Sequence, residues 1–88
     1  MTEQEMAQAI CAAASAKKAR DIVQMDMHGV MSSTDYFVVC SANTATQVRA
    51  IADNIEEELA KKGKAFLRRE GYREGEWVLM DYGDVIAH

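Results

Sequence analysis

Three aspartates stand where α/β enzymes often keep catalytic or metal-binding acids. Asp26, Asp81 and Asp84 each fall at the end of a predicted strand. Such carboxylates could hold magnesium for phosphoryl transfer, and a nucleotidyltransferase-type enzyme is therefore the rival hypothesis. The alternative is turn chemistry, because an aspartate side chain accepts hydrogen bonds from nearby backbone in turns such as residues 81–84. A tight carboxylate pair on one strand is not expected, because it would need an Asp-x-Asp pattern.

Histidine and cysteine form no constellation suited to metal binding or nucleophilic attack. His28 and His88 are far apart, and neither stands at a ligand spacing from Cys11 or Cys40. His28 is interpreted as a surface residue of a turn. Cys40 lies inside an apolar run, where burial raises the pKa of a thiol and makes a reactive thiolate unexpected. The two cysteines are predicted to be buried free thiols, with a disulfide between them as the alternative, and no metal or cofactor is predicted.

Three aromatic residues gather in the C-terminal part of the chain. Tyr72, Trp77 and Tyr82 surround two predicted turns. Exposed aromatic side chains are enriched at protein interfaces, so this segment is a candidate binding surface. For Trp77, a place in the core is an equal alternative. Tyr72 lies in a polar loop between charged residues, where a core position is harder to explain.

Composition favours a small globular protein that binds other proteins. The chain has 88 residues, enough for one domain, with 49% hydrophobic and 27% charged residues. Its net charge of −4 argues against direct nucleic-acid binding, since each phosphate contact needs a lysine or arginine, and favours a basic protein partner. No run approaches the roughly 20 apolar residues that cross a membrane. No signal peptide is visible, and a cytoplasmic location is expected.

One helix and two strands are predicted in the first half of the chain. A helix begins at Thr2, which forms a capping box with Glu5, and runs to residue 16. Residues 21–27 alternate between apolar and polar side chains, which is typical of a strand with one solvated face. Residues 36–40 form an unbroken apolar run, which predicts a central strand covered on both faces.

The second half predicts one more helix and three strands. The helix begins at Thr44, whose spacing to Gln47 again fits a capping box, and it carries one apolar stripe. Strands are predicted at 65–68, 77–80 and 85–88. The whole chain is therefore expected to be a single α/β domain, with helices packed on a mixed sheet of about five strands in the order α-β-β-α-β-β-β.

Five segments carry motifs of one known family in that family's order. They read Lys-Ala-Arg-Asp-Ile-Val at 18–23, Asp-Tyr-Phe-Val-Val-Cys-Ser at 35–41, Gln-Val-Arg-Ala-Ile-Ala-Asp at 47–53, Glu-Gly-Tyr at 70–72 and Trp-Val-Leu-Met-Asp-Tyr-Gly-Asp-Val at 77–85. Any one motif is weak, whereas five in order are specific. From about residue 4 to residue 88 the chain resembles the ribosomal silencing factor family, also called the Iojap family.

This resemblance implies a nucleotidyltransferase-like fold without enzymatic activity. Catalytic relatives carry Gly-Ser before the helix and paired acids after it, whereas residues 41–44 here read Ser-Ala-Asn-Thr. Family members are expected to bind the large ribosomal subunit through ribosomal protein number fourteen, which sterically blocks joining of the small subunit and represses translation. The acidic, aromatic tail that usually follows the last motif in the family is expected to be absent after residue 88.

Within the matched motifs, residue chemistry selects the candidate contacts for the partner. Trp77 would serve as an aromatic anchor, and the acids would accept hydrogen bonds from a basic protein. The candidate contact residues are Tyr72, Trp77, Leu79, Asp81, Tyr82 and Asp84. A homodimer formed along a sheet edge or an aromatic patch is a further expectation that is compatible with ribosome binding.

Overall fold

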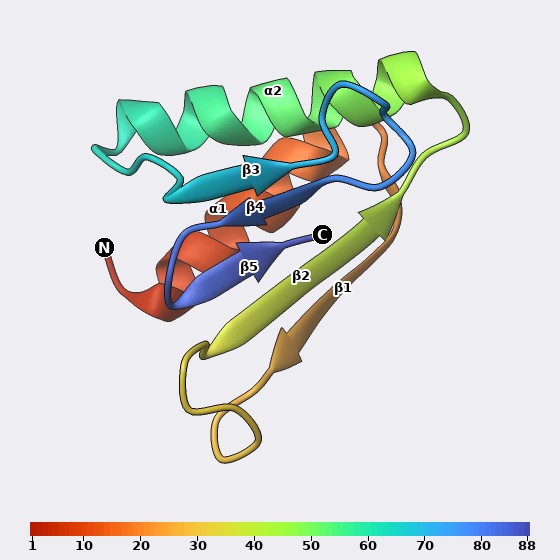
Figure 1. Cartoon of the computed structure of the whole chain (residues 1–88). Helices are drawn as coiled ribbons and strands as arrows, with labels where there is room; N and C mark the ends of the chain where they lie inside the picture. Colours follow the sequence, from red (N-terminus) through yellow and green to blue (C-terminus); the bar gives the residue numbers. More distant parts are fainter.

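One five-stranded sheet carries both helices on a single face (Figure 1). The computed structural model describes all residues from Met1 to His88. The elements are α1 (Glu3–Ala16), β1 (Arg20–Asp26), β2 (Tyr36–Ser41), α2 (Ala45–Lys61), β3 (Arg68–Glu70), β4 (Leu79–Asp81) and β5 (Val85–Ala87). The strands lie in the order β1-β2-β5-β4-β3, with β2 and β5 parallel and every other pair antiparallel. The predicted α/β class, mixed sheet and element order are confirmed.

Side-chain caps fix where both helices begin. The Thr2 hydroxyl accepts from the Glu5 N–H at 3.1 Å, and the Glu5 carboxylate accepts from the Thr2 N–H at 2.8 Å, so the predicted capping box is complete. The Thr44 hydroxyl likewise accepts from the Gln47 N–H at 3.1 Å. The Gln47 side chain, however, accepts from the Asn43 N–H at 3.3 Å, one residue before the expected donor.

The strand register shows which side chains face the helices. One row crosses all five strands and contains Gln24, Val38, Ala87, Met80 and Arg69. Both ends of this row touch helices, because the Cys11 thiol of α1 donates to the Gln24 side chain and the Arg69 guanidinium donates to Glu56 of α2. The core lies between this face and the two helices. Its largest fully buried side chains are Ile10, Leu59, Met80, Val38 and Val85.

The opposite face of the sheet has no helix on it, and we call it the open face. Its apolar side chains, from the alternate positions of the same strands, are Val23, Met25, Phe37, Val39, Leu79 and Ile86, and Trp77 lies in the loop that leads into β4. The prediction that β2 is covered on both faces is therefore wrong, and only Val38 of β2 is buried. The prediction of one buried face for β1 is also wrong, because six of its seven residues are exposed and one is half-buried.

Two strands begin later in the chain than predicted. β3 covers residues 68–70 rather than 65–68, and β4 covers 79–81 rather than 77–80. The reason is that β3 and β4 pair only over three residues each, with Arg68 opposite Asp81 and Glu70 opposite Leu79. The apolar residues at 65–67 and 77–78, which precede the paired residues of β3 and β4, therefore belong to the preceding loops. β5 ends at residue 87, one residue before the predicted end.

Both cysteines are free, as predicted, although neither is fully buried. Cys11 and Cys40 are half-buried, and this burial raises the pKa of both thiols above the ordinary value. Each side chain therefore favours the neutral thiol. Neither α1 nor α2 has the length and apolar character that a membrane-spanning helix needs.

Candidate protein-docking face

The open face exposes an apolar surface where a sheet normally packs against another layer. Trp77 is 49% exposed, Val23 is 48% exposed and Met25 is 36% exposed. Soluble proteins rarely leave a contiguous apolar surface of this kind uncovered unless it binds a partner. The open face is therefore the candidate docking face.

Trp77 is held at its position by the loop that carries it. Gly71 has a φ of +78°, and a Cβ added there would lie 1.7 Å from the Trp77 carbonyl oxygen, so only glycine permits this close contact. Gly75 is packed against Ala45 at the start of α2 in the same way. The Trp77 indole also packs edge-to-face on the His88 ring, with 4.5 Å between the centroids. The Trp77 backbone is thus fixed at Gly71, and its exposed indole rests on His88.

Leu79 and Asp81 of β4 follow Trp77 in the chain and lie on the open face. Leu79 is half-buried and extends the apolar surface along β4. One oxygen of Asp81 accepts from the Gly83 N–H at 2.7 Å, and the other lies 3.8 Å from the Arg68 guanidinium. Asp81 is therefore a fixed acid at the border between the apolar surface and the charged residues of β3. The hydrogen bond from the Gly83 N–H to the Asp81 carboxylate is an interaction within a turn, as expected if Asp81 has a structural role instead of a catalytic one.

Two other predicted contact residues lie away from the open face. Tyr82 is only 8% exposed and its hydroxyl is buried without a hydrogen-bond partner. Burial raises the pKa of Tyr82 to about 12. Tyr72 is half-buried beside α2, where the Arg69 guanidinium lies 4.0 Å from its ring centroid and a hydrogen bond to Asp53 raises the pKa of the phenol. Both tyrosines help to fix the C-terminal loops to α2.

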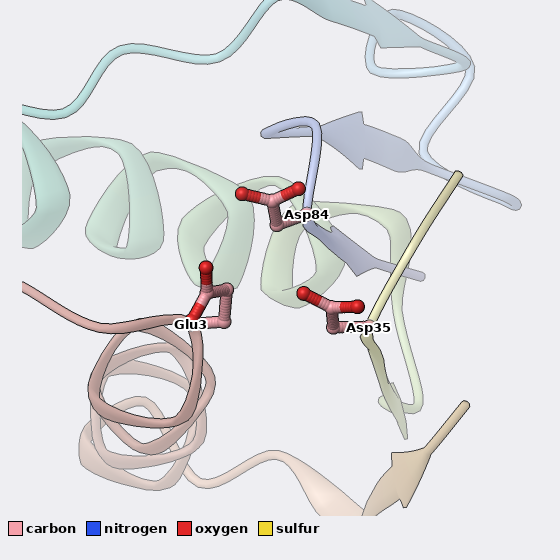
Figure 2. Close-up of side chains that lie close together, drawn as sticks. All are labelled: Glu3, Asp35 and Asp84. Carbon is pink, nitrogen blue, oxygen red and sulfur yellow. The ribbon is translucent and has the colours of Figure 1, made fainter. Parts of the chain in front are cut away.

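Asp84 belongs to a different acidic group from the one predicted. Figure 2 shows its carboxylate close to those of Glu3 and Asp35, and oxygen atoms of the three lie within 4.8 Å of one another. Asp26 and Asp81 are not members of this group. The magnesium site that the rival enzyme hypothesis would build from Asp26, Asp81 and Asp84 is therefore not assembled. Exposed acidic groups of this kind are common without an ion, and the carboxylates by themselves assign no ligand.

His28 connects the two ends of the loop between β1 and β2. Its Nδ1 lies 2.6 Å from an Asp26 oxygen, its Nε2 lies 3.3 Å from an Asp35 oxygen, and its ring packs edge-to-face on Tyr36. The hydrogen bond to Asp26 is the main reason that the pKa of His28 is raised. The backbone N–H of His28 donates to Asp26 and is the main reason that the pKa of this carboxyl is lowered. His28 is a surface loop residue, as predicted, with a structural role.

Sequence reasoning missed the part of the docking face that lies on the first strands. The alternation in residues 21–27 does show that Val23 and Met25 share a face, but not that this face is uncovered. It also missed an apolar pocket of about 220 Å³ between α2 and the sheet, whose lining includes Trp77, so that Trp77 stands at the border between this pocket and the open face. The pocket reaches buried residues such as Ile10 and Ile55, and the polar side chains of its lining include Glu76 and His88.

Comparison with known proteins finds one family throughout. The sequence model of the family described as "Ribosomal silencing factor during starvation" matches residues 1–88. The ribosomal silencing factor of Bacillus subtilis (strain 168) is 38% identical over 88 residues, which span all of this chain and 75% of that protein. The ribosomal silencing factor of Halalkalibacterium halodurans shows the same identity and the same coverage.

Two crystal structures share the fold. A protein of Chromobacterium violaceum superposes with a TM-score of 0.97 at 32% identity, and the match covers all of this chain and 73% of that one. A protein of Bacillus halodurans superposes with a TM-score of 0.91 at 38% identity, over 97% of this chain and 79% of the other. Sequence and fold agree, and the chain belongs to the ribosomal silencing factor family.

Proposed function

We propose that this protein binds the large ribosomal subunit through its open face and thereby prevents the small subunit from joining. The protein contact on the ribosome is ribosomal protein number fourteen, with Trp77 and Leu79 at the centre of the interface. The observation that carries the proposal is the exposed Trp77, fixed in the loop that borders an uncovered sheet face, in a chain of the silencing factor family. The repression is steric and needs no reaction.

Physical properties of the face support binding to a basic protein. Tryptophan contributes most to protein interfaces when it is surrounded by other apolar contacts that exclude water. Val39, which lines the same pocket as Trp77, and Leu79, two residues later in the chain, are apolar residues placed to provide them. The chain carries a net charge of −4, which attracts a basic ribosomal protein during encounter. Asp81 at the border of the face supplies an acceptor for a lysine or arginine of the partner.

Sedimentation of the protein with purified large subunits tests this proposal. The Trp77→Ala variant is expected to bind more weakly by about 1–2 kcal/mol, or roughly five- to thirty-fold in Kd, because the substitution removes the aromatic anchor. Val30→Ala is the matched control, since Val30 is an exposed apolar residue of the loop between β1 and β2. This control should bind like the unmodified protein.

Circular dichroism of both variants is recorded first, so that lost binding is not confused with lost folding. Failure of the unmodified protein to sediment with large subunits would contradict ribosome binding itself. Equal binding by the folded Trp77→Ala variant would leave ribosome binding in place but remove the open face as its site.

A further inference from the structure

Both helices end in the same backbone motif, but the two ends differ in the residue at its left-handed position. The paired backbone hydrogen bonds of this Schellman motif run from Lys18 to Ser15, from Ala19 to Ala14, from Gly63 to Ala60 and from Lys64 to Leu59. The motif needs one residue with a positive φ, and that residue is usually glycine. In α2 it is Gly63, with a φ of +78°, whereas in α1 it is Lys18, with a φ of +62°.

A lysine at this position costs stability that a glycine would not cost. The left-handed conformation brings the Cβ of an L-residue too close to the following carbonyl oxygen. The dipole of α1 does not require Lys18, because Lys17 at the C-cap already places a cation at this end of the helix. Residues that break a local rule of this kind are expected at functional sites. Because Lys18 is exposed, its function belongs to the surface.

Lys18 is the centre of a small basic surface. Lys17, Lys18 and Arg20 are all exposed, and we call these three residues the basic turn. None of them forms an ion pair within the chain, and neither does the neighbouring Asp21. Three of the ten lysine and arginine residues thus stand within four positions, and the net charge of −4 conceals this uneven distribution.

The start of α2 fixes the shape of the basic turn and adds positive potential beside it. The Gln47 side-chain amide donates to the Lys17 carbonyl at 3.4 Å and to the Lys18 carbonyl at 3.2 Å. Gln47 belongs to the first turn of α2, which contains no acidic residue, so the positive end of the helix dipole is not neutralised there. In Figure 1 the end of α1 and the start of α2 lie at the same end of the molecule.

The basic turn also lies close to the proposed docking face. Arg20 is paired with Ser41 in the ladder between β1 and β2. Ser41 in turn lines the same pocket as Trp77. A large partner that covers Trp77 can therefore reach the basic turn without any change of conformation in this chain.

We propose that the basic turn binds phosphate groups of ribosomal RNA when the protein is docked on the large subunit. The inference rests on the proposed function and adds a second class of contact to it. A basic ribosomal protein would repel Lys17, Lys18 and Arg20, whereas RNA phosphates attract lysine and arginine. The negative charge of the rest of the chain keeps binding to free RNA weak, so the phosphate contact depends on docking through the open face.

Substitutions at Lys18 separate binding from stability. Lys18→Gly should unfold at a higher urea concentration, because glycine suits the left-handed position. The same variant should raise the Kd for purified large subunits about five- to eightfold in about 0.1 M KCl, because it removes one phosphate contact. Lys18→Gln should weaken binding equally without the gain in stability, since it keeps a side chain at this φ. Lys62→Gln is the matched control, because Lys62 is the exposed C-cap of α2, and it should bind like the unmodified protein.

The salt dependence of sedimentation with large subunits shows whether the lost contact is electrostatic. At constant magnesium, the slope of log Kd against log KCl concentration should fall by about 0.7–0.9 in both Lys18 variants. An unchanged Kd and slope would overturn the inference and leave ribosome binding in place. A loss of stability in Lys18→Gly would overturn it as well, because Lys18 would then serve the fold. Failure of the unmodified protein to sediment with large subunits would remove the proposed function and this inference together.

Directed cleavage distinguishes RNA from an acidic protein as the partner of the basic turn. Fe(II)-EDTA attached to Lys17→Cys should cut ribosomal RNA in the bound complex, because Lys17 then lies beside the phosphate backbone. The same reagent on Lys62→Cys should not cut these nucleotides, and treatment of the unmodified protein shows any cleavage that arises from Cys11 and Cys40. A reduced salt slope without RNA cleavage from position 17 would overturn the proposal, because the basic turn would then bind an acidic protein surface.

Discussion

Tyr82 carries a buried hydroxyl that has no hydrogen-bond partner. Removing such a group relieves an unfavourable burial, so Tyr82→Phe should raise the free energy of unfolding at neutral pH by about 1 kcal/mol. Urea unfolding followed by circular dichroism measures this change. A loss of stability would instead show that the hydroxyl makes a favourable contact in solution.

The same residue gives the stability of the protein a specific pH dependence. The folded state raises the pKa of Tyr82 from 10.0 to about 12, so folding favours the neutral phenol. This contribution to stability is complete below pH 10.0 and decreases as the pH rises toward about 12, because the unfolded chain loses the proton first. The advantage of Tyr82→Phe in unfolding free energy over the unmodified protein should therefore grow as the pH increases, because the variant has no phenol to ionise. A constant difference would contradict burial of the phenol.

At the scale of elements, the contact of Gly71 with Trp77 joins the two ends of the loop between β3 and β4. Gly71 and Gly29 both have positive φ values, +78° and +79°. Alanine at Gly29 meets no atom within 4 Å, so Gly29→Ala should cost only the backbone strain of about 1 kcal/mol. Alanine at Gly71 must also displace the Trp77 carbonyl, so Gly71→Ala should destabilise the protein distinctly more.

Urea unfolding of the two alanine variants separates the cost of backbone strain at a positive φ from the cost of the steric clash with the Trp77 carbonyl. The two glycines share the same backbone conformation, so the difference between the variants reports the contact with Trp77 alone. Tryptophan fluorescence should change in folded Gly71→Ala and not in Gly29→Ala, because only the first moves the Trp77 backbone. Equal stabilities for the two variants would show that the loop is looser than described.

Local sequence signals predicted the elements better than they predicted the environment of each face. Caps at Thr2 and Thr44 and the apolar run of β2 depend on neighbouring residues, and these elements form where expected. Which face is covered depends on where the helices pack, and alternation in β1 carries no information on that. The two helices share one face, so the other side of β2 stays open although its sequence is apolar throughout.

The candidate site was only partly accessible to sequence reasoning for the same reason. Leu79 and Asp81 alternate along β4 and come to lie together on the open face, whereas Trp77 lies in the loop before this strand. Tyr82 lies two residues after Met80, so the period of two places both on the helix side, and this signal could have separated Tyr82 from the others. The grouping of Asp84 with Glu3 joins opposite ends of the chain, and no local pattern indicates it.

At the scale of the whole molecule, steric repression requires one uncovered face that binds the large subunit and a protein large enough to obstruct joining of the small subunit. The most direct measurement is light scattering when small subunits are mixed with large subunits that have first been incubated with the protein. Joining should fall as the concentration of protein rises, and Trp77→Ala should need a roughly five- to thirty-fold higher concentration for the same effect. Unchanged joining by large subunits that are saturated with bound protein would contradict steric repression.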